Sequence, residues 1–118
     1  MSAAAGHEDD ADLPFRVRGE ATQDATVLAL EGDLDIVSAH EAGQALSRAQ
    51  AAGGTVILDL RRLRFMDSSG LRVVLEAQRR AASAGERARL QVAPGEGDVR
   101  RVFDVSGVGG LIEIVDGP

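Results

Sequence analysis

The centre of the chain contains the most informative segments: TVILDL at residues 55–60, RRLRFM at 61–66, DSSG at 67–70 and LRVVLE at 71–76. The first segment is a β-branched apolar run and the last repeats apolar residues at helical spacing, so the stretch predicts a strand, a short polar–apolar loop and an amphipathic helix. Ser68 then stands where the helix begins, beside backbone amides that are still unpaired. A phosphate on Ser68 would meet those N–H donors and the positive end of the helix dipole. The order of residues therefore predicts a covalent switch rather than a catalytic centre.

The composition restricts the chain to one domain and excludes several kinds of site. With 118 residues and three aromatic side chains, all of them Phe, the chain can bury one mainly aliphatic core. Its net charge of −6 argues against a nucleic-acid interface, which requires a basic surface. The absence of Cys excludes disulfides, thiolate catalysis and cysteine-ligated zinc.

The N-terminal segment differs in composition from the rest of the chain. Residues 1–13 are small, acidic and polar, and they lack the basic and apolar regions of a signal peptide. No apolar run in the sequence approaches the length of a membrane span. We therefore expect a disordered acidic tail at 1–13, one domain at 14–118, and a cytoplasmic protein without membrane contact.

Hydrophobic patterns and glycine breaks predict strands and helices in alternation. The second strand has a continuous apolar centre, which predicts burial on both faces, and Gly32-Asp33 should end it. Either Ser38 or Asp35 can cap the first helix. The connections are too long for hairpins and imply a largely parallel sheet. The expected strands are 15–18, 25–31, 55–60, 88–92 and 111–115, with a polar turn at 19–24, and the expected helices are 38–52, 68–85 and a short one around 99–106. The buried stripe of the second helix should comprise Leu71, Val74, Leu75 and Ala82, opposite a solvated face of Arg72, Glu76 and Arg80.

Three segments carry a family resemblance: FMDSSGL at 65–71, EGDLD at 31–35 and RVFDVSG at 101–107. In order and spacing they resemble the phosphorylation loop, the early turn and the late helix of bacterial anti-sigma factor antagonists, which are single-domain proteins with the STAS fold. The resemblance covers roughly residues 15–115 and implies an α/β domain with a mixed, mostly parallel sheet and helices packed mainly on one side. Family members usually continue into a C-terminal helix, whereas this sequence ends at Asp116-Gly117-Pro118. Either that helix is dispensable or the third helix covers the same apolar surface.

The resemblance also implies which residues act. Ser68 occupies the position of the phosphorylated serine, although a serine at a helix start is more often only a cap. Asp67 is a cap, a group that orders the turn, or an acidic neighbour that repels the phosphate, and Ser69 lies one step further into the first turn. Gly70 either lets a partner backbone approach closely or is simply tolerated in the first turn. We expect Asp67, Ser69, Gly70 and Arg72 to belong to the partner surface.

Two carboxylates should join this surface. Asp33 and Asp35 follow the second strand, and the carboxyl ends of parallel strands share one edge of a sheet. No nearby His or Lys completes a catalytic pair with them, and His7 and His40 have no companion at metal-ligand spacing. The sequence has no nucleophile elbow, phosphate loop or dinucleotide motif. We therefore predict no metal, no cofactor and no enzymatic activity, and interpret both carboxylates as turn, cap and partner-contact residues.

The leading functional hypothesis follows from the resemblance. The unphosphorylated protein, a monomer when free, would bind an anti-sigma factor and release a sigma factor. That anti-sigma factor would itself be a serine kinase that phosphorylates Ser68 and ends the interaction, and a PP2C-type serine phosphatase would restore the binding form. The alternative is a STAS adaptor subunit that docks to the ATPase of a transport or lipid-handling complex. The identities of the sigma and anti-sigma factors, the upstream signal and the stoichiometry are not encoded in any motif.

Overall fold

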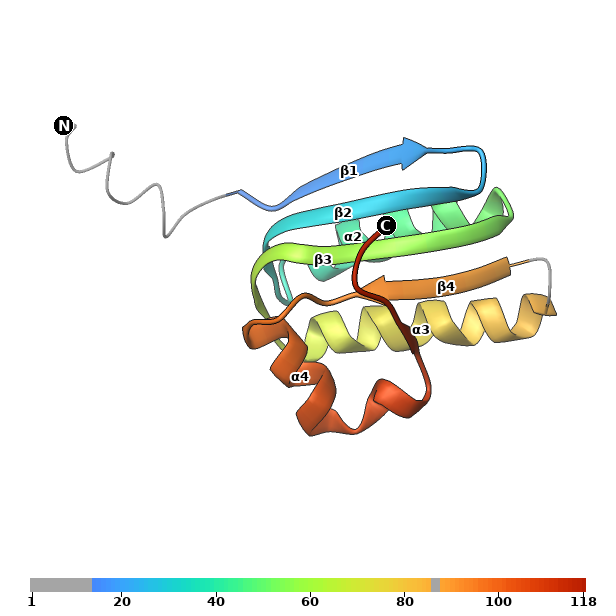
Figure 1. The fold of residues 1–118 in the computed structure, drawn as a ribbon. Helices are drawn as coiled ribbons and strands as arrows, with labels where there is room; N and C mark the ends of the chain where they lie inside the picture. Colours follow the sequence, from blue (N-terminus) through green and yellow to red (C-terminus); the bar gives the residue numbers. More distant parts are fainter. Residues whose placement is uncertain (1–13, 86–87) are drawn as a thin grey trace, which may run out of the picture.

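Strands and helices alternate along the chain as expected, in a computed structural model that describes residues 14–85 and 88–118. The predicted tail at 1–13 lies outside the described residues. The elements are β1 (Arg16–Ala21), β2 (Ala25–Leu34), α2 (Ala39–Ala51), β3 (Gly54–Met66), α3 (Ser68–Ala84), β4 (Ala88–Ala93), α4 (Asp98–Ser106), a 3-10 turn η2 (Val108–Gly110) and β5 (Glu113–Ile114). The sheet order is β1-β2-β3-β4-β5, in which β1 runs antiparallel to β2 and the other neighbours are parallel. The expected mixed, mostly parallel sheet is confirmed (Figure 1).

The helices α2 and α3 cover one face of this sheet (Figure 1). Side chains alternate along β2, so Leu28, Leu30 and Leu34 are buried toward the helices while Val27 and Ala29 on the other face are only half-buried. The prediction of burial on both faces of β2 is therefore wrong. The α4 helix follows β4 and packs against β3, where its Phe103 is fully buried. The helices thus lie mainly on one side of the sheet, as the resemblance implied.

The strands β2 and β3 are both longer than the sequence indicated. Gly32 does not end β2, because the strand continues to Leu34 through two register shifts against β3. Glycine is required there: Gly32 has φ +92°, and a Cβ would lie 2.9 Å from the carbonyl oxygen of Pro14. The predicted loop at 61–66 is likewise strand, because its residues pair with the extended end of β2. Only Asp67 separates β3 from α3.

Three smaller differences have equally local causes. The predicted turn at 19–24 shortens to residues 22–24, because β1 pairs with β2 as far as Ala21 and the Thr22 hydroxyl bonds the backbone of Ala25. The last strand is reduced to Glu113–Ile114, because the chain is still turning at Leu111, whose backbone N–H donates to the carbonyl oxygen of Val108 at 2.8 Å. In the predicted stripe of α3, Val74 is buried as expected and Leu71 and Leu75 are half-buried against the core, whereas Ala82 is exposed. The other buried residues of α3 are Gly70, Val73, Ala77 and Ala81.

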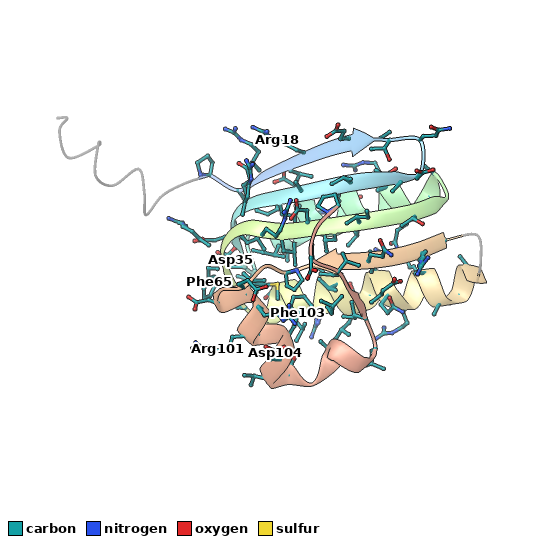
Figure 2. All side chains as sticks on the ribbon, viewed as in Figure 1. Arg18, Asp35, Phe65, Arg101, Phe103 and Asp104 are labelled. Atoms are coloured by element: carbon teal, nitrogen blue, oxygen red, sulfur yellow. The ribbon has the colours of Figure 1, made fainter. Side chains whose placement is uncertain are left out.

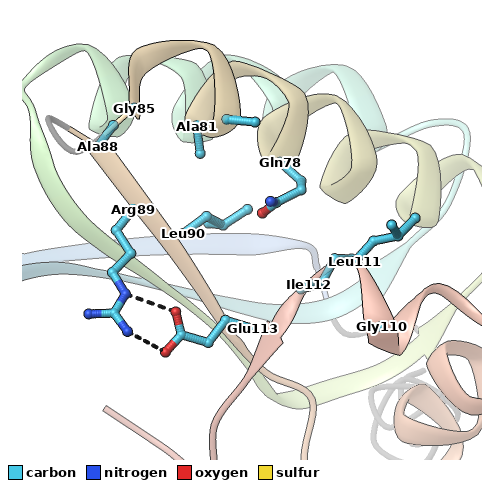
Figure 3. Close-up of a pocket in the computed structure, with 11 residues that line it drawn as sticks. Gln78, Ala81, Gly85, Ala88, Arg89, Leu90, Gly110, Leu111, Ile112 and Glu113 are labelled. Atoms are coloured by element: carbon cyan, nitrogen blue, oxygen red, sulfur yellow. Dashed lines mark hydrogen bonds and ion pairs between the residues drawn. The ribbon is translucent and has the colours of Figure 1, made fainter.

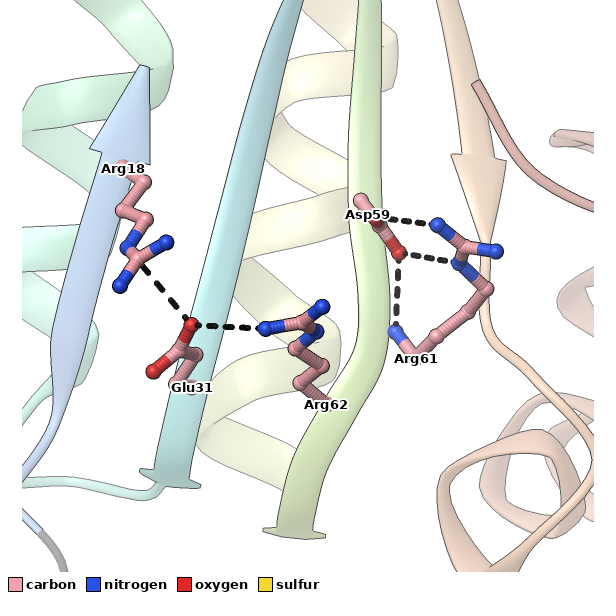
Figure 4. A network of polar contacts seen from close by, with 5 residues as sticks. All are labelled: Arg18, Glu31, Asp59, Arg61 and Arg62. Atoms are coloured by element: carbon pink, nitrogen blue, oxygen red, sulfur yellow. Dashed lines mark hydrogen bonds and ion pairs between the residues drawn. The ribbon is translucent and has the colours of Figure 1, made fainter. Parts of the chain in front are cut away.

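The face of the sheet opposite α2 and α3 carries charged pairs (Figure 4). Glu31 lies 3.8 Å from Arg18 and 3.7 Å from Arg62, and the guanidinium of Arg61 donates two hydrogen bonds to the carboxylate of Asp59, at 2.9 and 3.0 Å. The side-chain hydrogen bond from Arg61 holds the pKa of Asp59 below its ordinary value, although burial acts in the opposite direction. These ion-paired side chains make the surface of this face polar, although half-buried apolar residues lie between them.

Candidate functional site

The loops that follow β2 and β3 meet at one edge of the sheet. Leu34 and Met66 are paired in register at the ends of the two strands, and the backbone N–H of Asp67 donates to the carbonyl oxygen of Leu34 at 3.2 Å. The geometric expectation that the Asp33–Asp35 and Asp67–Ser68 segments share an edge is therefore confirmed. We call this region the switch edge.

Asp67, rather than Ser68, caps the helix α3. Its carboxylate accepts a hydrogen bond from the backbone N–H of Ser69 at 2.8 Å, and its carbonyl oxygen accepts from the N–H groups of Gly70 and Leu71, both at 3.1 Å. Ser68 is the first helical residue, and it is exposed. The expectation of several unpaired amides beside Ser68 is wrong, because Asp67 already engages the next three. Within residues 14–85 and 88–118 the Ser68 hydroxyl has no hydrogen-bond partner, so it is free to react.

The turn between β2 and α2 is held by a small polar network. The carboxylate of Asp35 accepts hydrogen bonds from the backbone N–H groups of Val37 and Ser38, at 3.0 and 3.2 Å. The Ser38 hydroxyl in turn donates to the carbonyl oxygen of Asp33 at 2.7 Å and accepts from the N–H of Asp35 at 3.0 Å. Ser38 holds the N-cap position, but its side chain makes no capping hydrogen bond to the helix, and Asp35 bonds the amides of Val37 and Ser38 just before it. This network fixes the turn that precedes α2.

Three large apolar side chains are exposed at the switch edge. Ile36 is 79% and Val37 86% exposed in that turn, and Phe65, 48% exposed, lies opposite Asp33 on the neighbouring strand. Figure 2 shows Asp35 and Phe65 at the same end of the molecule, beside the start of α4. The sequence interpretation did not single out Ile36 and Val37, although two β-branched apolar residues inside a polar turn were a usable signal. Exposed apolar residues gathered beside a reactive hydroxyl suit a protein-binding surface.

The predicted acidic contact residues differ in their availability. Asp33 lies within β2 and accepts two hydrogen bonds from the Arg64 guanidinium, at 3.0 and 3.2 Å, so its charge is neutralised in part. The carboxylate of Asp35 accepts hydrogen bonds from amides of the turn, and one carboxylate oxygen of Asp67 accepts the capping hydrogen bond from Ser69. Among these carboxylates, Asp67 is next in sequence to Ser68.

Gly70 is buried inside the domain. A Cβ at this position would lie 2.6 Å from Cγ of Met66 and 2.8 Å from Cγ of Leu34, both of which belong to the core. Packing of α3 onto the ends of β2 and β3 therefore accounts for glycine here. Neither the approach of a partner backbone nor simple tolerance is needed to explain it.

A hollow of about 430 Å³ opens between α2 and α3 beside Ser68. We call it the α2–α3 hollow, and it is lined by Ile36, Ala39, His40, Ser68, Ser69, Arg72, Val73 and Glu76. Arg72 is exposed, as predicted for the solvated face of this helix, and it lines the same hollow as Ser68. His40 comes from α2, and its Nε2 lies 3.4 Å from Nε2 of Gln44.

The described surface has further hollows away from Ser68. A second hollow, of about 410 Å³, lies between α3, β4 and the segment 110–113, where Arg89 and Glu113 form two hydrogen bonds of 2.8 Å (Figure 3). Its lining contains no Ser, Thr, Cys or His. Within the described part of the chain, no group of three or more His, Asp or Glu side chains is placed to hold a metal ion. The described helices are all too short or too polar to cross a membrane.

Comparison with known proteins agrees with the fold. Residues 17–115 match a family model described as "Mlab, STAS domain". The chain belongs to the STAS-domain family. It is 36% identical over 91 residues to an anti-sigma F factor antagonist of Lysinibacillus sphaericus, an alignment that covers 75% of each chain. The STAS family and the α/β fold that the motifs suggested are therefore confirmed.

Two solved structures extend the likeness to three dimensions. SpoIIAA, an anti-sigma factor antagonist, in its unphosphorylated form superposes with a TM-score of 0.65 at 28% identity, covering 89% of this chain and 90% of the other. The Bacillus cell fate determinant SpoIIAA in its phosphorylated form gives a TM-score of 0.60 at 31% identity, with 86% and 91% covered. This STAS domain is thus similar to a protein that exists in phosphorylated and unphosphorylated forms.

Proposed function

We propose that this STAS domain is an anti-sigma factor antagonist whose binding is switched off by phosphorylation of Ser68. The unphosphorylated form would bind an anti-sigma factor and so release a sigma factor. One observation carries the proposal: Ser68 is exposed at the start of α3 and its hydroxyl has no hydrogen-bond partner among the described residues, at an edge that also exposes Ile36, Val37 and Phe65. The likeness to anti-sigma factor antagonists supports it. We retain a cytoplasmic location and a monomeric free state as parts of this proposal.

The chemistry of the switch needs no catalytic group on this chain. An anti-sigma factor with serine kinase activity would transfer the γ-phosphoryl group of ATP to Oγ of Ser68, with loss of the hydroxyl proton and release of ADP. A PP2C-type phosphatase would hydrolyse the ester with water and release inorganic phosphate. In this scheme the chain is a substrate and an inhibitor, and it completes no turnover of its own.

The residues at the switch edge support a mechanism in which a single phosphate on Ser68 prevents partner binding. Ile36, Val37 and Phe65 supply the apolar area that a partner would bury, while Asp33, Asp35 and Ser69 form its polar surroundings. Phosphoserine carries about −1.5 to −2 charges near neutral pH, and Asp67 already places a carboxylate next to Ser68. A partner that closes over this surface would have to desolvate that charge, which is costly. We therefore expect loss of binding without any change of fold.

Calorimetry with matched variants tests the proposal. The partner to be titrated is a histidine-kinase-like anti-sigma factor, sought among the products of the neighbouring genes. Ser68→Ala should bind as tightly as the wild type, whereas Ser68→Asp should bind at least about tenfold more weakly, or about 1.4 kcal/mol. Ser83→Asp is the control, because Ser83 is exposed near the far end of the same helix. Equal affinity for the Ala and Asp variants of Ser68 would refute the switch.

A second function is kept because of the family model. That model is named for Mlab rather than for an anti-sigma factor antagonist, so membership of the family does not by itself select the first function. In the alternative, the domain would be an adaptor that docks to the ATPase of a transport or lipid-handling complex. Pull-down from native lysate followed by mass spectrometry separates the two. Recovery of transporter subunits with wild type and Ser68→Asp alike would favour the adaptor.

A further inference from the structure

The phosphate that the proposed function places on Ser68 would find few free backbone donors. Asp67 occupies the N–H groups of Ser69, Gly70 and Leu71, which leaves only the N–H of Ser68 itself. Asp67 also brings a negative charge next to the new dianion. A phosphate held in one position on this surface would therefore need a cation from elsewhere on the chain.

Arg72 is placed to supply that cation. It lies four residues after Ser68 on α3, where side chains one turn apart are neighbours. Helical side chains lean toward the N-terminus of their helix, so Arg72 can reach the Oγ position of Ser68 one turn before it. Both residues line the α2–α3 hollow. Arg72 is exposed and makes no hydrogen bond or ion pair with any residue in the described ranges, so no existing contact must break.

Other charged groups around the hollow also affect how strongly a phosphate would be bound there. His40 faces Ser68 from α2 and adds positive charge when it is protonated. Asp67 at the cap and Glu76 one turn beyond Arg72 act in the opposite direction. The β2–α2 turn contributes only the apolar Ile36 to the lining. A guanidinium forms two parallel hydrogen bonds with a phosphate, so Arg72 is the strongest of these groups as a phosphate ligand.

We propose that Arg72, with His40 across the α2–α3 hollow, binds the phosphate of phosphorylated Ser68 within the same molecule. This inference rests on the proposed function and assigns Arg72 a role beyond partner contact. The phosphate is then held along the surface of α3 and over the hollow, where it blocks the switch edge. In the phosphorylated form, the phosphate and the side chains of Arg72 and His40 would therefore be ordered on this surface.

The test uses protein that carries phosphoserine at position 68, incorporated during translation so that no kinase or partner is needed. The second pKa of the phosphate is followed by ³¹P NMR against an ordinary value of about 6. Binding to Arg72 favours the dianion, so Arg72→Gln should raise this pKa by at least about 0.3 pH units. Arg72→Lys keeps the charge and should fall between the two. Arg79→Gln is the control, because Arg79 is exposed further along the same helix.

Each outcome decides the inference separately from the proposed function. An unchanged phosphate pKa in Arg72→Gln, or an equal rise in Arg79→Gln, would overturn intramolecular binding by Arg72. His40→Gln should raise the phosphate pKa by a smaller amount than Arg72→Gln, and a larger rise would overturn the leading role of Arg72. The proposed function is tested by binding of the unphosphorylated protein, which these titrations do not involve. Normal partner switching with no Arg72 effect would therefore refute this inference alone.

Discussion

Replacement of Gly70 by Ala tests whether this glycine serves packing inside the domain. The new Cβ would lie 2.6 Å from Cγ of Met66 and 2.8 and 2.9 Å from Cγ and Cδ2 of Leu34. Leu34 is fully buried and Met66 is 4% exposed, so neither side chain can move aside easily. Overpacking of this kind costs about 1–3 kcal/mol, and the better helix propensity of Ala returns about 0.5–1 kcal/mol. We expect a net loss of about 1–2 kcal/mol.

Urea and thermal unfolding followed by circular dichroism measure this loss. For a domain of this size it corresponds to a melting temperature roughly 5–10 °C lower. Gly43→Ala is the matched control: Gly43 lies inside α2, and its Cβ would meet nothing within 4 Å. That variant should be more stable than the wild type by about 0.5–1 kcal/mol. If Gly70→Ala were as stable as the wild type but bound its partner poorly, close approach of a partner would be the correct explanation and the packing argument would fail.

Three further outcomes are expected. Asp67→Ala removes the cap of α3 and should cost about 1 kcal/mol in urea unfolding, whereas Asp67→Asn keeps an acceptor and should cost much less. Arg61 lowers the pKa of Asp59, so the stabilisation from this carboxylate is present above about pH 4. That stabilisation is lost as the pH falls through the lowered pKa. The wild type should therefore lose more stability than Asp59→Asn between about pH 5 and about pH 3. Phosphorylation of Ser68 should change the melting temperature by only a few degrees, because an exposed charge pair contributes little, and amide NMR shifts that spread through β2 and β3 would contradict this.

The sequence predicted topology better than the limits of its elements. Alternating apolar runs and helical stripes indicated the order of strands and helices, because each pattern depends on neighbours along the chain. The same reasoning stopped β2 at Gly32 and β3 at Leu60, since glycine and arginine look like local breaks. Pairing between the two strands overrides that local signal. No property of either segment alone reveals a partner that lies 30 or so residues away.

At the candidate site, too, the sequence predicted some features and the structure was needed for others. The motif around Ser68 was sufficient to predict an exposed serine at the start of a helix, and the structure agrees. The sequence left three roles open for Asp67 and two for Gly70. Hydrogen bonds at 2.8 and 3.1 Å assign the cap to Asp67, and contact with Leu34 and Met66 explains Gly70.

By itself, the sequence determined the family, the order of the elements and the position of the serine, because each depends on residue types at short spacing. Only the tertiary structure decided which amides near Ser68 remain free, which carboxylates are already bonded, and which apolar side chains face solvent. Ile36 and Phe65 are far apart in the chain, yet both are exposed at the switch edge. They share that edge because the parallel strands β2 and β3 end side by side, and this pairing is a property of the folded sheet.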